Sequence, residues 1–397
     1  MSKRIFVTGM GIISALGKNV PETFDALSHC RSGIGPIRLL DTIHKNTIPV
    51  AEVPSSNEEL AVLLDLANRN DLTRTTLLAI KAVKEAAGSA RLTDFKGTGL
   101  ISANTVGGMD KSEQFYYDYL KLKKVNPFIA THDCADSTEK VADIFGIDKF
   151  VTTLSTACSS ASNAVLLGAR MIQNGTLKHV IAGGTECLTK FHLNGFNSLK
   201  ILDYEPCKPF DKNRAGINLG EGAAYIVLES EEVAERNGKE YFFELKGWGN
   251  ACEAFHQTAS SPEGNGAYLA MKKALEMSEL KPDDIAYINA HGTGTDNNDI
   301  SEGRAIERLF APHIPLVSST KPYTGHTTSA AGTVESIITL LGMKHNMVFP
   351  NLNFKEQMPE LSFAPVDQLI TNIQLNHALS NSFGFGGNNT TLIFSKI

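Results

Sequence analysis

The stretch Val151-Thr-Thr-Leu-Ser-Thr-Ala-Cys-Ser-Ser-Ala-Ser-Asn-Ala-Val165 joins two patterns. Its opening residues are apolar or β-branched, which predicts a strand. The small residues from Ser159 onward predict a helix that can lie close to other backbone and is therefore buried. Cys158 stands at the junction, where the helix dipole favours negative charge, so we expect a lowered thiol pKa and a nucleophilic role. The alternative is an inert buried thiol, which is the common fate of free cysteine.

Apolar runs and helical stretches alternate along the rest of the chain. We expect strands at residues 5–8, 98–103, 179–183, 223–228, 241–245, 285–289, 316–318 and 391–394. Helical composition marks residues 21–27, 72–87, 267–277 and 302–309. This alternation predicts an α/β fold with helices on both faces of the sheet.

A weak internal repeat divides the chain. Residues 6–11 (FVTGMG) resemble residues 244–249 (ELKGWG), and each segment begins a series of expected strands. A polar run at residues 230–240 separates the two series. We therefore predict two similar halves, residues 1–238 with Cys158 and residues 239–397. The long segment 202–220 has no clear periodicity, and we expect it to cover an active site.

Two histidines lie in the second half. His291 follows the strand expected at 285–289 and begins HGTGT, so it should face the crevice where α/β proteins bind ligands. His326 ends TKPYTGH, after the strand at 316–318 and before small residues that predict another buried helix at 327–334. Lys321 and Glu335 belong to the same unit. The alternatives are structural histidines in tight turns, a surface lysine and a glutamate on a helix face.

A glycine-rich turn precedes the last strand. Residues 381–389 read NSFGFGGNN, where glycine alternates with phenylalanine. Such a loop can direct an amide N–H at a developing oxyanion, and the bare pattern is also compatible with a phosphate loop or a hairpin. A P-loop is disfavoured, because no Lys-Ser/Thr follows the glycines. The N-terminal GMGIIS at residues 9–14 has serine at the third glycine of a dinucleotide fingerprint and is rejected as a cofactor site.

Composition excludes several classes of function. The 397 residues carry a formal net charge of −6 and show no basic run, which argues against nucleic-acid binding. The six cysteines lack CxxC spacing, as in proteins of a reducing compartment. The N-terminus does not read as a signal peptide, and no segment reaches the roughly 18 apolar residues of a membrane span. A cytoplasmic location is the expectation.

In this order, the four motifs resemble those of the β-ketoacyl-acyl carrier protein synthases of types I and II, and the likeness runs from VTGMGIIS to NSFGFGGNN. The resemblance implies the thiolase fold, with two pseudo-symmetric βαβ halves in five αβαβα layers. It also implies decarboxylative condensation of an acyl group on the cysteine with malonyl-acyl carrier protein. No metal or redox cofactor is implied, since the substrates ride on the phosphopantetheine of acyl carrier protein.

The resemblance assigns roles to particular residues. Cys158 is the implied acylated nucleophile, His291 and His326 the decarboxylation pair, and Lys321 the lysine that supports them, with Glu335 behind. Phe385 is the implied gate, whose N–H joins that of Cys158 in the oxyanion hole. The implied substrate-binding residues are Thr293, Thr295, Phe383 and Phe196, with the two threonines holding pantetheine.

Departures from the common family pattern bear on the pathway. The nucleophile motif reads TACSSA where SACATG is more usual, and DNND follows HGTGT where proline-alanine-glycine-aspartate is commoner. Both features resemble synthases of polyketide and aryl polyene pathways. A histidine at 326 favours an elongating enzyme over the chain-initiating third type, and the absence of cysteine from residues 381–389 disfavours a thiolase. A non-catalytic chain-length factor is disfavoured by Cys158 and both histidines. The partner in an expected dimer, a second copy or such a factor, is left open.

Overall fold

The computed structural model describes residues 3–122, 126–236, 238 and 243–397. Within these residues ten strands form one mixed sheet. Five strands belong to the first part of the chain: β1 (Ile5–Ser14), β2 (Gly99–Ala103), β3 (Phe150–Leu154), β4 (His179–Glu186) and β5 (Gly222–Ser230). Five belong to the second: β6 (Phe243–Cys252), β7 (Tyr287–Asn289), β8 (Leu316–Ser318), β11 (His377–Phe383) and β12 (Asn388–Lys396). Strands β9 (Met347–Val348) and β10 (Ile370–Thr371) form a separate pair.

The order of the strands repeats. The sheet runs β3-β2-β4-β5-β1-β6-β12-β11-β7-β8, so reading outward from the β1–β6 contact gives the same chain order in each part. The directions repeat as well, because the outer two pairs on each side are parallel and the inner two antiparallel. Strands β1 and β6 pair antiparallel at Phe6–Glu244 and Val7–Phe243. Phe6 and Glu244 are the first residues of the two repeated sequence segments, so the repeat marks the pseudo-twofold axis.

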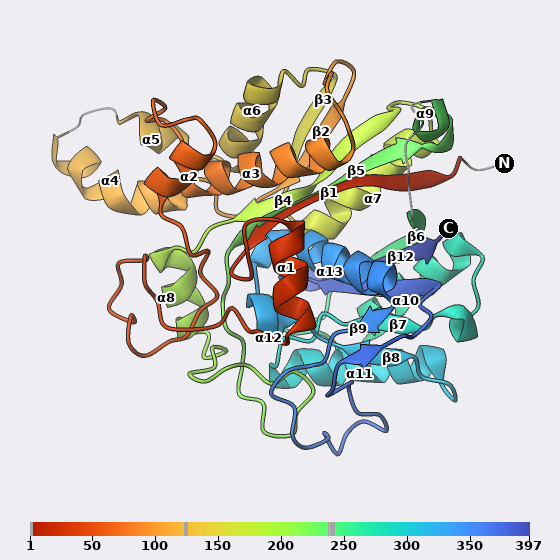
Figure 1. Cartoon of the computed structure of the whole chain (residues 1–397). Coiled ribbons are helices and arrows are strands. Elements are labelled where there is room, and N and C mark those ends of the chain that lie inside the picture. The colour runs from red at the N-terminus through yellow and green to blue at the C-terminus, as the bar shows by residue number, and fades with distance from the viewer. Residues whose placement is uncertain (1–2, 123–125, 237, 239–242) are drawn as a thin grey trace.

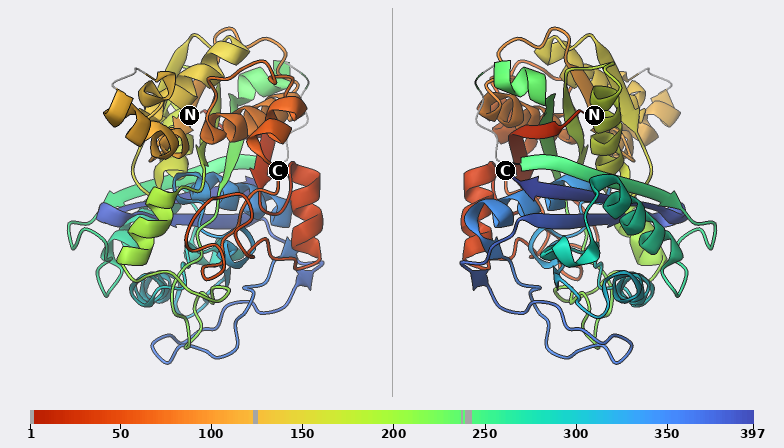
Figure 2. Two further views of the ribbon diagram at one scale, coloured as in Figure 1. Left: turned by 90° about the vertical axis from the view of Figure 1, so that its left-hand side faces the viewer. Right: turned by 90° about the vertical axis from the view of Figure 1, so that its right-hand side faces the viewer.

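Helices complete five layers. Helix α3 (Arg74–Ser89) covers the outer face of the first part of the sheet, and α10 (Asn265–Ser278) and α11 (Asp296–Phe310) cover the outer face of the second. Helices α7 (Ser160–Gln173) and α13 (Ala331–His345) lie between the two parts. Figure 2 shows most of the first part of the chain stacked above the second from both sides. The predicted thiolase-like architecture is confirmed.

The remaining helices are short or peripheral. They are α1 (Val20–Ser28), α2 (Asn57–Leu63), α4 (Met109–Leu122), α5 (Pro127–Ala130), α6 (Cys134–Phe145), α8 (Lys190–Ser198), α9 (Glu231–Arg236), α12 (Lys321–Thr324) and the 3₁₀ turns η1 (Pro282–Asp284), η2 (Thr328–Ala330) and η3 (Phe385–Gly387). No described helix is both long enough and apolar enough to cross a membrane. The boundary between the two halves was predicted between residues 238 and 239. Residues 237 and 239–242 lie outside the described residues, so this boundary stays a prediction.

Small residues allow the two middle helices to meet. A methyl group at Gly332 of α13 would collide with the hydroxyl of Ser162 in α7. The hydroxyl of Ser162 in turn donates to the Ser382 hydroxyl at 2.9 Å, at the end of β11. Helix α13 is buried along its length from Ala331 to Met343. The small residues after Cys158 therefore allow α7 to lie close to other backbone, as the sequence predicted. They bring the start of α7 against the second half of the chain.

Glycine misled the prediction of the first strand. We expected this strand to end at Thr8, whereas β1 continues through Gly9 and Gly11 to Ser14. The two glycines instead let α3 approach, because a methyl group at either would collide with a carbonyl oxygen of that helix. Gly247 and Gly249 of β6 do the same for α10. The repeated Gly-x-Gly is thus a close strand–helix contact present in both halves.

Other differences concern element bounds. Helix α11 begins at Asp296, whereas residues 302–309 were expected, and β6 continues to Cys252. Residues 241–242 of the expected strand 241–245 lie outside the described residues. Strand β11 was not predicted; its second half contains the polar residues Ser380, Asn381 and Ser382, which are buried here.

Candidate active site

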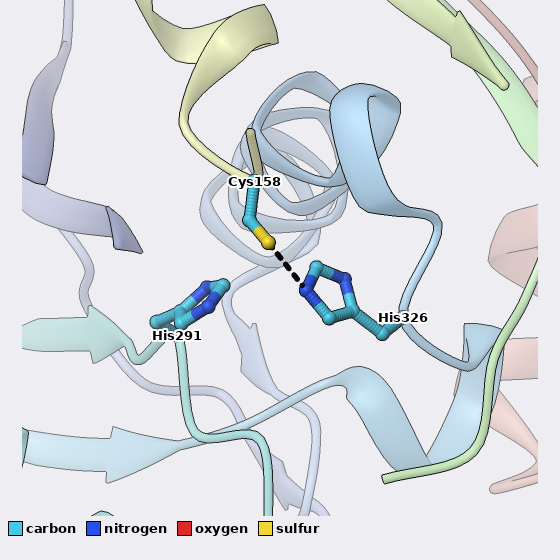
Figure 3. Close-up of side chains that lie close together, drawn as sticks. All are labelled: Cys158, His291 and His326. Atoms are coloured by element: carbon cyan, nitrogen blue, oxygen red, sulfur yellow. Dashed lines mark hydrogen bonds between the residues drawn. The ribbon is translucent and has the colours of Figure 1, made fainter. Parts of the chain in front are cut away.

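Cys158 sits on a sharp turn between strand and helix. Strand β3 ends at Leu154, α7 begins at Ser160, and Ala157 between them has φ +54°. A left-handed conformation costs a non-glycine residue about 1–2 kcal/mol. Side-chain hydrogen bonds hold the turn, since the Ser160 hydroxyl accepts from the Thr156 N–H at 2.7 Å and donates to the Ala157 carbonyl at 2.6 Å. The turn directs the Cys158 side chain away from α7 and into the site (Figure 3).

Two histidines from the second half converge on this sulfur (Figure 3). Nε2 of His326 lies 3.0 Å from Sγ of Cys158. The His291 and His326 ring centroids are 5.3 Å apart. One side-chain nitrogen of each histidine and the sulfur of Cys158 all lie within 4.8 Å of one another. His291 follows β7 as predicted. His326 was expected at a strand end, but the four-residue helix α12 intervenes after β8.

Lys321 and Glu335 lie behind His291 in the core. The Lys321 ammonium donates to a Glu335 carboxylate oxygen, to the carbonyl oxygen of His291, and to Nδ1 of His291 at 3.2 Å. An ammonium has three N–H donors, and all three are used. The alternative of a surface lysine is wrong, since Lys321 is buried. Glu335 does lie on a helix, α13, but it is buried there as well.

These contacts fix the tautomer of both rings. Nδ1 of His291 accepts from Lys321, and Nδ1 of His326 accepts from the backbone N–H of Thr328 at 3.2 Å. A neutral imidazole carries one proton, so in each ring that proton is on Nε2. Burial, reinforced by the charge of Lys321, lowers the pKa of both histidines well below the ordinary value of 6.5. At neutral pH the site therefore presents two neutral Nε2–H donors.

The hydrogen bonds that fix these two tautomers also argue against a metal centre. Cys158, His291 and His326 are close enough together to bind an ion. A histidine that binds a metal through Nε2 carries its proton on Nδ1 and donates it to a carboxylate or carbonyl. Here both Nδ1 atoms face N–H donors, from Lys321 and Thr328, so the tautomer is the wrong one for metal binding through Nε2.

The thiol of Cys158 differs from the sequence expectation. We expected the N-terminus of the helix to lower its pKa, yet burial raises the pKa of Cys158 to about 11. Lys321 and the backbone N–H groups of Phe385 and Cys158 itself oppose the rise. Removal of water around a charge that must form on sulfur outweighs these donors. The resting free enzyme thus holds a protonated thiol.

Alkylation of Cys158 by iodoacetamide will accelerate with pH throughout the range 7 to 9. The thiolate is the reactive form, and below its pKa its fraction grows about tenfold per pH unit. Peptide mass spectrometry would follow the rate at this residue, with Cys158→Ala as the blank for the other five cysteines. A rate that is already level at pH 8 would show that the helix terminus, and not burial, controls this thiol.

A cavity of about 240 Å³ opens onto the three residues. Its lining includes every other implied active-site residue except the buried Lys321 and Glu335, namely Thr293, Thr295, Phe196, Phe383 and Phe385. The hydroxyls of Thr293 and Thr295 are 2.8 Å apart. Ala215, Gly216 and Ile217 of the segment expected to cover the site also line the cavity.

Two phenylalanines of the glycine-rich turn occupy different positions. Phe383 is 6% exposed and packs beside His291, with ring centroids 5.9 Å apart. Phe385 is 36% exposed and stacks on Phe196 of α8, with centroids 6.0 Å apart and an interplanar angle of 18°. Phe385 is therefore not a core residue. The fold positions Phe196 opposite the turn although nearly 190 residues separate them in the chain.

Sequence reasoning missed two buried carboxylates that hold the HGTGT loop. Glu302 accepts from the backbone N–H groups of His291 and Gly292, each at 2.8 Å. Asp299 accepts from the N–H groups of Thr293 and Gly294 at 3.0 and 3.2 Å. Burial raises the pKa of Glu302 to about 7 and raises that of Asp299. The available signal was their spacing of three residues, which puts two acidic side chains on one helix face directly after the loop.

Comparisons with known proteins agree with this arrangement. Models of the N-terminal and C-terminal domains of beta-ketoacyl synthase match residues 2–234 and 242–355. The chain is 33% identical over 411 residues to 3-oxoacyl-[acyl-carrier-protein] synthase 2 of Staphylococcus aureus (strain COL), covering 100% of this chain and 99% of that protein. The ishigamide ketosynthase/chain length factor structure superposes with a TM-score of 0.93 at 28% identity, over 100% of both chains. A beta-ketoacyl synthase from Burkholderia phymatum STM815 gives 0.88 at 28%, also over 100% of both chains.

The chain belongs to the β-ketoacyl synthase family. It is accordingly an acyltransferase of the condensing type, which joins two acyl units in fatty acid or polyketide synthesis. The family assignment made from the four motifs is confirmed, and so is the reaction class that it implied.

Proposed function

We propose that this chain elongates an acyl thioester on Cys158 with malonyl-acyl carrier protein. The observation that carries the proposal is the convergence of one thiol and two Nε2–H donors on a single cavity. The relatives named 3-oxoacyl-[acyl-carrier-protein] synthase 2 support carrier-bound substrates. The reaction needs no metal or redox cofactor, because the loss of CO₂ supplies its driving force.

The first half-reaction loads the enzyme. Cys158 attacks the thioester of an acyl-carrier protein, so the bond from acyl carbon to pantetheine sulfur breaks and a bond to Sγ forms. The thiol proton ends on the released pantetheine thiol. The Nε2–H of His326 donates to Sγ at 3.0 Å and stabilises the negative charge that sulfur carries on the way. A hydrogen bond to a charged group contributes about 1.5–3 kcal/mol.

The second half-reaction makes the carbon–carbon bond. Malonyl-carrier protein loses CO₂, and the electron pair of the broken bond becomes an enolate whose oxygen accepts from Nε2–H of His291 and His326. The enolate carbon attacks the acyl-Cys158 thioester, and the N–H groups of Cys158 and Phe385 hold the tetrahedral oxyanion. The Cys158 thiolate then leaves and takes one proton from solvent, with CO₂ and 3-oxoacyl-carrier protein as products. Each oxyanion donor is typically worth about 3 kcal/mol.

Thr293 and Thr295 are proposed to bind the pantetheine arm. Both line the cavity, and their paired hydroxyls offer a donor and acceptor to its amide groups. Phe383 and Phe196 supply apolar contacts in the same cavity. Lys321 and Glu335 act on His291 from behind and touch no substrate.

The relatives support a proposal about the partner, and the sequence motifs support one about the pathway. Two of the solved structures pair a ketosynthase with a chain length factor: the ishigamide proteins, and ApeO with ApeC from Xenorhabdus doucetiae, the latter 28% identical with a TM-score of 0.86 over 100% of this chain and 98% of that one. The motifs TACSSA and DNND, by their resemblance to such synthases, support a polyketide or aryl polyene pathway. We infer a dimer with such a factor or with a second copy. The free thiols support a cytoplasmic location.

A reconstituted assay tests the proposal. The purified chain, with and without a candidate chain length factor, is incubated with acyl-carrier protein, and the mass of the Cys158 peptide is measured. Malonyl-carrier protein is then added and the carrier-bound product identified. The proposal requires an acyl adduct on Cys158 and a product two carbons longer bearing a 3-oxo group. Adduct formation at a different residue would overturn it.

Phe385 is proposed to gate the malonyl site. Phe385 and Cys158 line the same cavity, and Gly384 and Gly386 flank Phe385 with freer backbone, Gly386 at φ +81°. The ring is more than a third exposed and is held by stacking on Phe196, so it can swing away without opening the core. Movement would admit malonyl thioester after Cys158 has been acylated.

Phe385→Ala should slow condensation while barely changing stability. The backbone N–H remains, so the oxyanion hole is kept, and the exposed ring leaves no core cavity. Phe383→Ala is the matched control, because it removes a buried ring of the same turn at a cost of about 3–5 kcal/mol. Melting temperature and condensation rate are measured for both. A large fall in the melting temperature of Phe385→Ala with an unchanged condensation rate would contradict the gating role.

A further inference from the structure

The two oxyanion donors of the proposed function come from different halves of the molecule. The N–H of Cys158 belongs to the turn before α7, and the N–H of Phe385 belongs to the turn between β11 and β12. Both act on one oxygen atom, so their separation must hold to a few tenths of an ångström. Something must therefore tie the two turns together.

Asn388 makes that connection. Its Oδ1 lies within hydrogen-bonding distance of three donors: the Ser159 hydroxyl at 2.8 Å, Nδ2 of Asn163 at 2.8 Å and Nδ2 of Asn250 at 3.0 Å. The Ser159 hydroxyl shares its one proton between Asn388 and the carbonyl oxygen of Thr156, which is also at 2.8 Å. Ser159 is the residue after the nucleophile. The backbone carbonyl of Asn388 accepts from the Gly384 N–H at 2.8 Å and closes the turn that carries Phe385. One residue thus holds both donor-bearing turns.

The surrounding amides brace Asn388. Oδ1 of Asn163 accepts from Asn250 Nδ2 at 3.0 Å and from the Thr390 hydroxyl at 2.8 Å, while Nδ2 of Asn163 also donates to the Thr156 hydroxyl at 2.9 Å. Strand β6, strand β12 and helix α7 therefore meet in one polar network. Satisfied networks of this kind fix a single arrangement of the elements that they join.

We propose that Asn388 is a positioning residue for the oxyanion hole, acting through its Oδ1 on Ser159 and through its carbonyl on Gly384. It touches no reacting atom. The oxyanion hole serves acyl transfer and condensation, because both pass through a tetrahedral intermediate on the Cys158 thioester. Decarboxylation instead uses His291 and His326, which no bond of this network reaches. Loss of Asn388 should therefore divide the steps of the reaction in a way that general destabilisation would not.

The test compares Asn388→Ala with Asn388→Asp. Alanine removes the acceptor of all three bonds, and we expect acyl transfer and condensation to fall together, by about 10- to 100-fold in kcat, below the full loss of an oxyanion donor. CO₂ release from malonyl-carrier protein, compared between Cys158→Ala with and without Asn388→Ala, should not change. Aspartate keeps an acceptor oxygen at the same place, and we expect it to restore both steps nearly to wild-type rates.

Several outcomes would overturn the inference. Equal loss of all three steps with a lower melting temperature would reveal a merely structural role, and unchanged rates in Asn388→Ala would remove any role. Failure of aspartate to rescue would show that the acceptor is not what matters. Should Asn388→Ala not fold, Ser159→Ala removes one donor alone and must slow the same two steps. The proposed function is judged separately, by condensation in the wild-type protein.

Discussion

Replacing Cys158 with alanine will abolish condensation while leaving CO₂ release from malonyl-carrier protein measurable. Removing the nucleophile of a covalent mechanism lowers kcat by about 10⁵- to 10⁶-fold, the largest loss that we expect from any single change in this chain. In the proposed mechanism the sulfur of Cys158 forms the acyl bond, whereas the donors for the enolate are on His291 and His326. The residual decarboxylation should therefore survive the loss of the thiol.

Cys187→Ala is the control for this variant. Cys187 is also a buried free thiol, but it accepts from the Thr75 hydroxyl at 3.1 Å and is absent from the lining of the active-site cavity. Its removal should lower stability slightly and leave condensation near the wild-type rate. Intact mass after incubation with acyl-carrier protein must show no adduct on Cys158→Ala. A 3-oxoacyl product formed by that variant at the wild-type rate would exclude Cys158 as the nucleophile.

The positions of the active-site residues were largely predictable, because local patterns specify them. A strand followed by small residues places Cys158 at a helix start, and a strand followed by HGTGT places His291 at a sheet edge. The pseudo-twofold arrangement then brings Cys158 of the first half and His291 of the second half together. The repeated Gly-x-Gly segments at 9–11 and 247–249 indicated this arrangement. Each of these signals lies within about fifteen residues of sequence, where pattern is most informative.

What the sequence could not predict depends on contacts between distant segments. The thiol pKa follows from how completely the second half and the turn at 384–387 cover Cys158, and burial outweighed the helix dipole. The histidine tautomers depend on donation from Lys321 and from the N–H of Thr328. The sequence does not indicate that either group donates to a histidine. Asn388 looked like part of a glycine-rich loop, and its three donors come from residues 159, 163 and 250.

The tautomers have a direct consequence for the histidine variants. His291→Ala should become acylated at nearly the wild-type rate and release CO₂ about 10²- to 10³-fold more slowly, the usual effect of losing one oxyanion donor. No described hydrogen bond joins His291 to Sγ of Cys158, so the first half-reaction keeps its geometry. Acylation is read by intact mass, and CO₂ release is measured with malonyl-carrier protein alone.

His326→Ala should differ from His291→Ala in one respect. His326 donates to the sulfur at 3.0 Å and, in the proposed mechanism, also to the enolate. We therefore expect a similar loss of CO₂ release together with acylation slowed about tenfold, the equivalent of one hydrogen bond to a charged group. His291→Ala then loses CO₂ release and keeps acylation, whereas Cys158→Ala loses acylation and keeps CO₂ release, a division that general misfolding cannot produce. Retained CO₂ release in both histidine variants would refute the decarboxylation pair. Equal acylation rates in the two would instead show that the contact between His326 and Cys158 contributes nothing to loading.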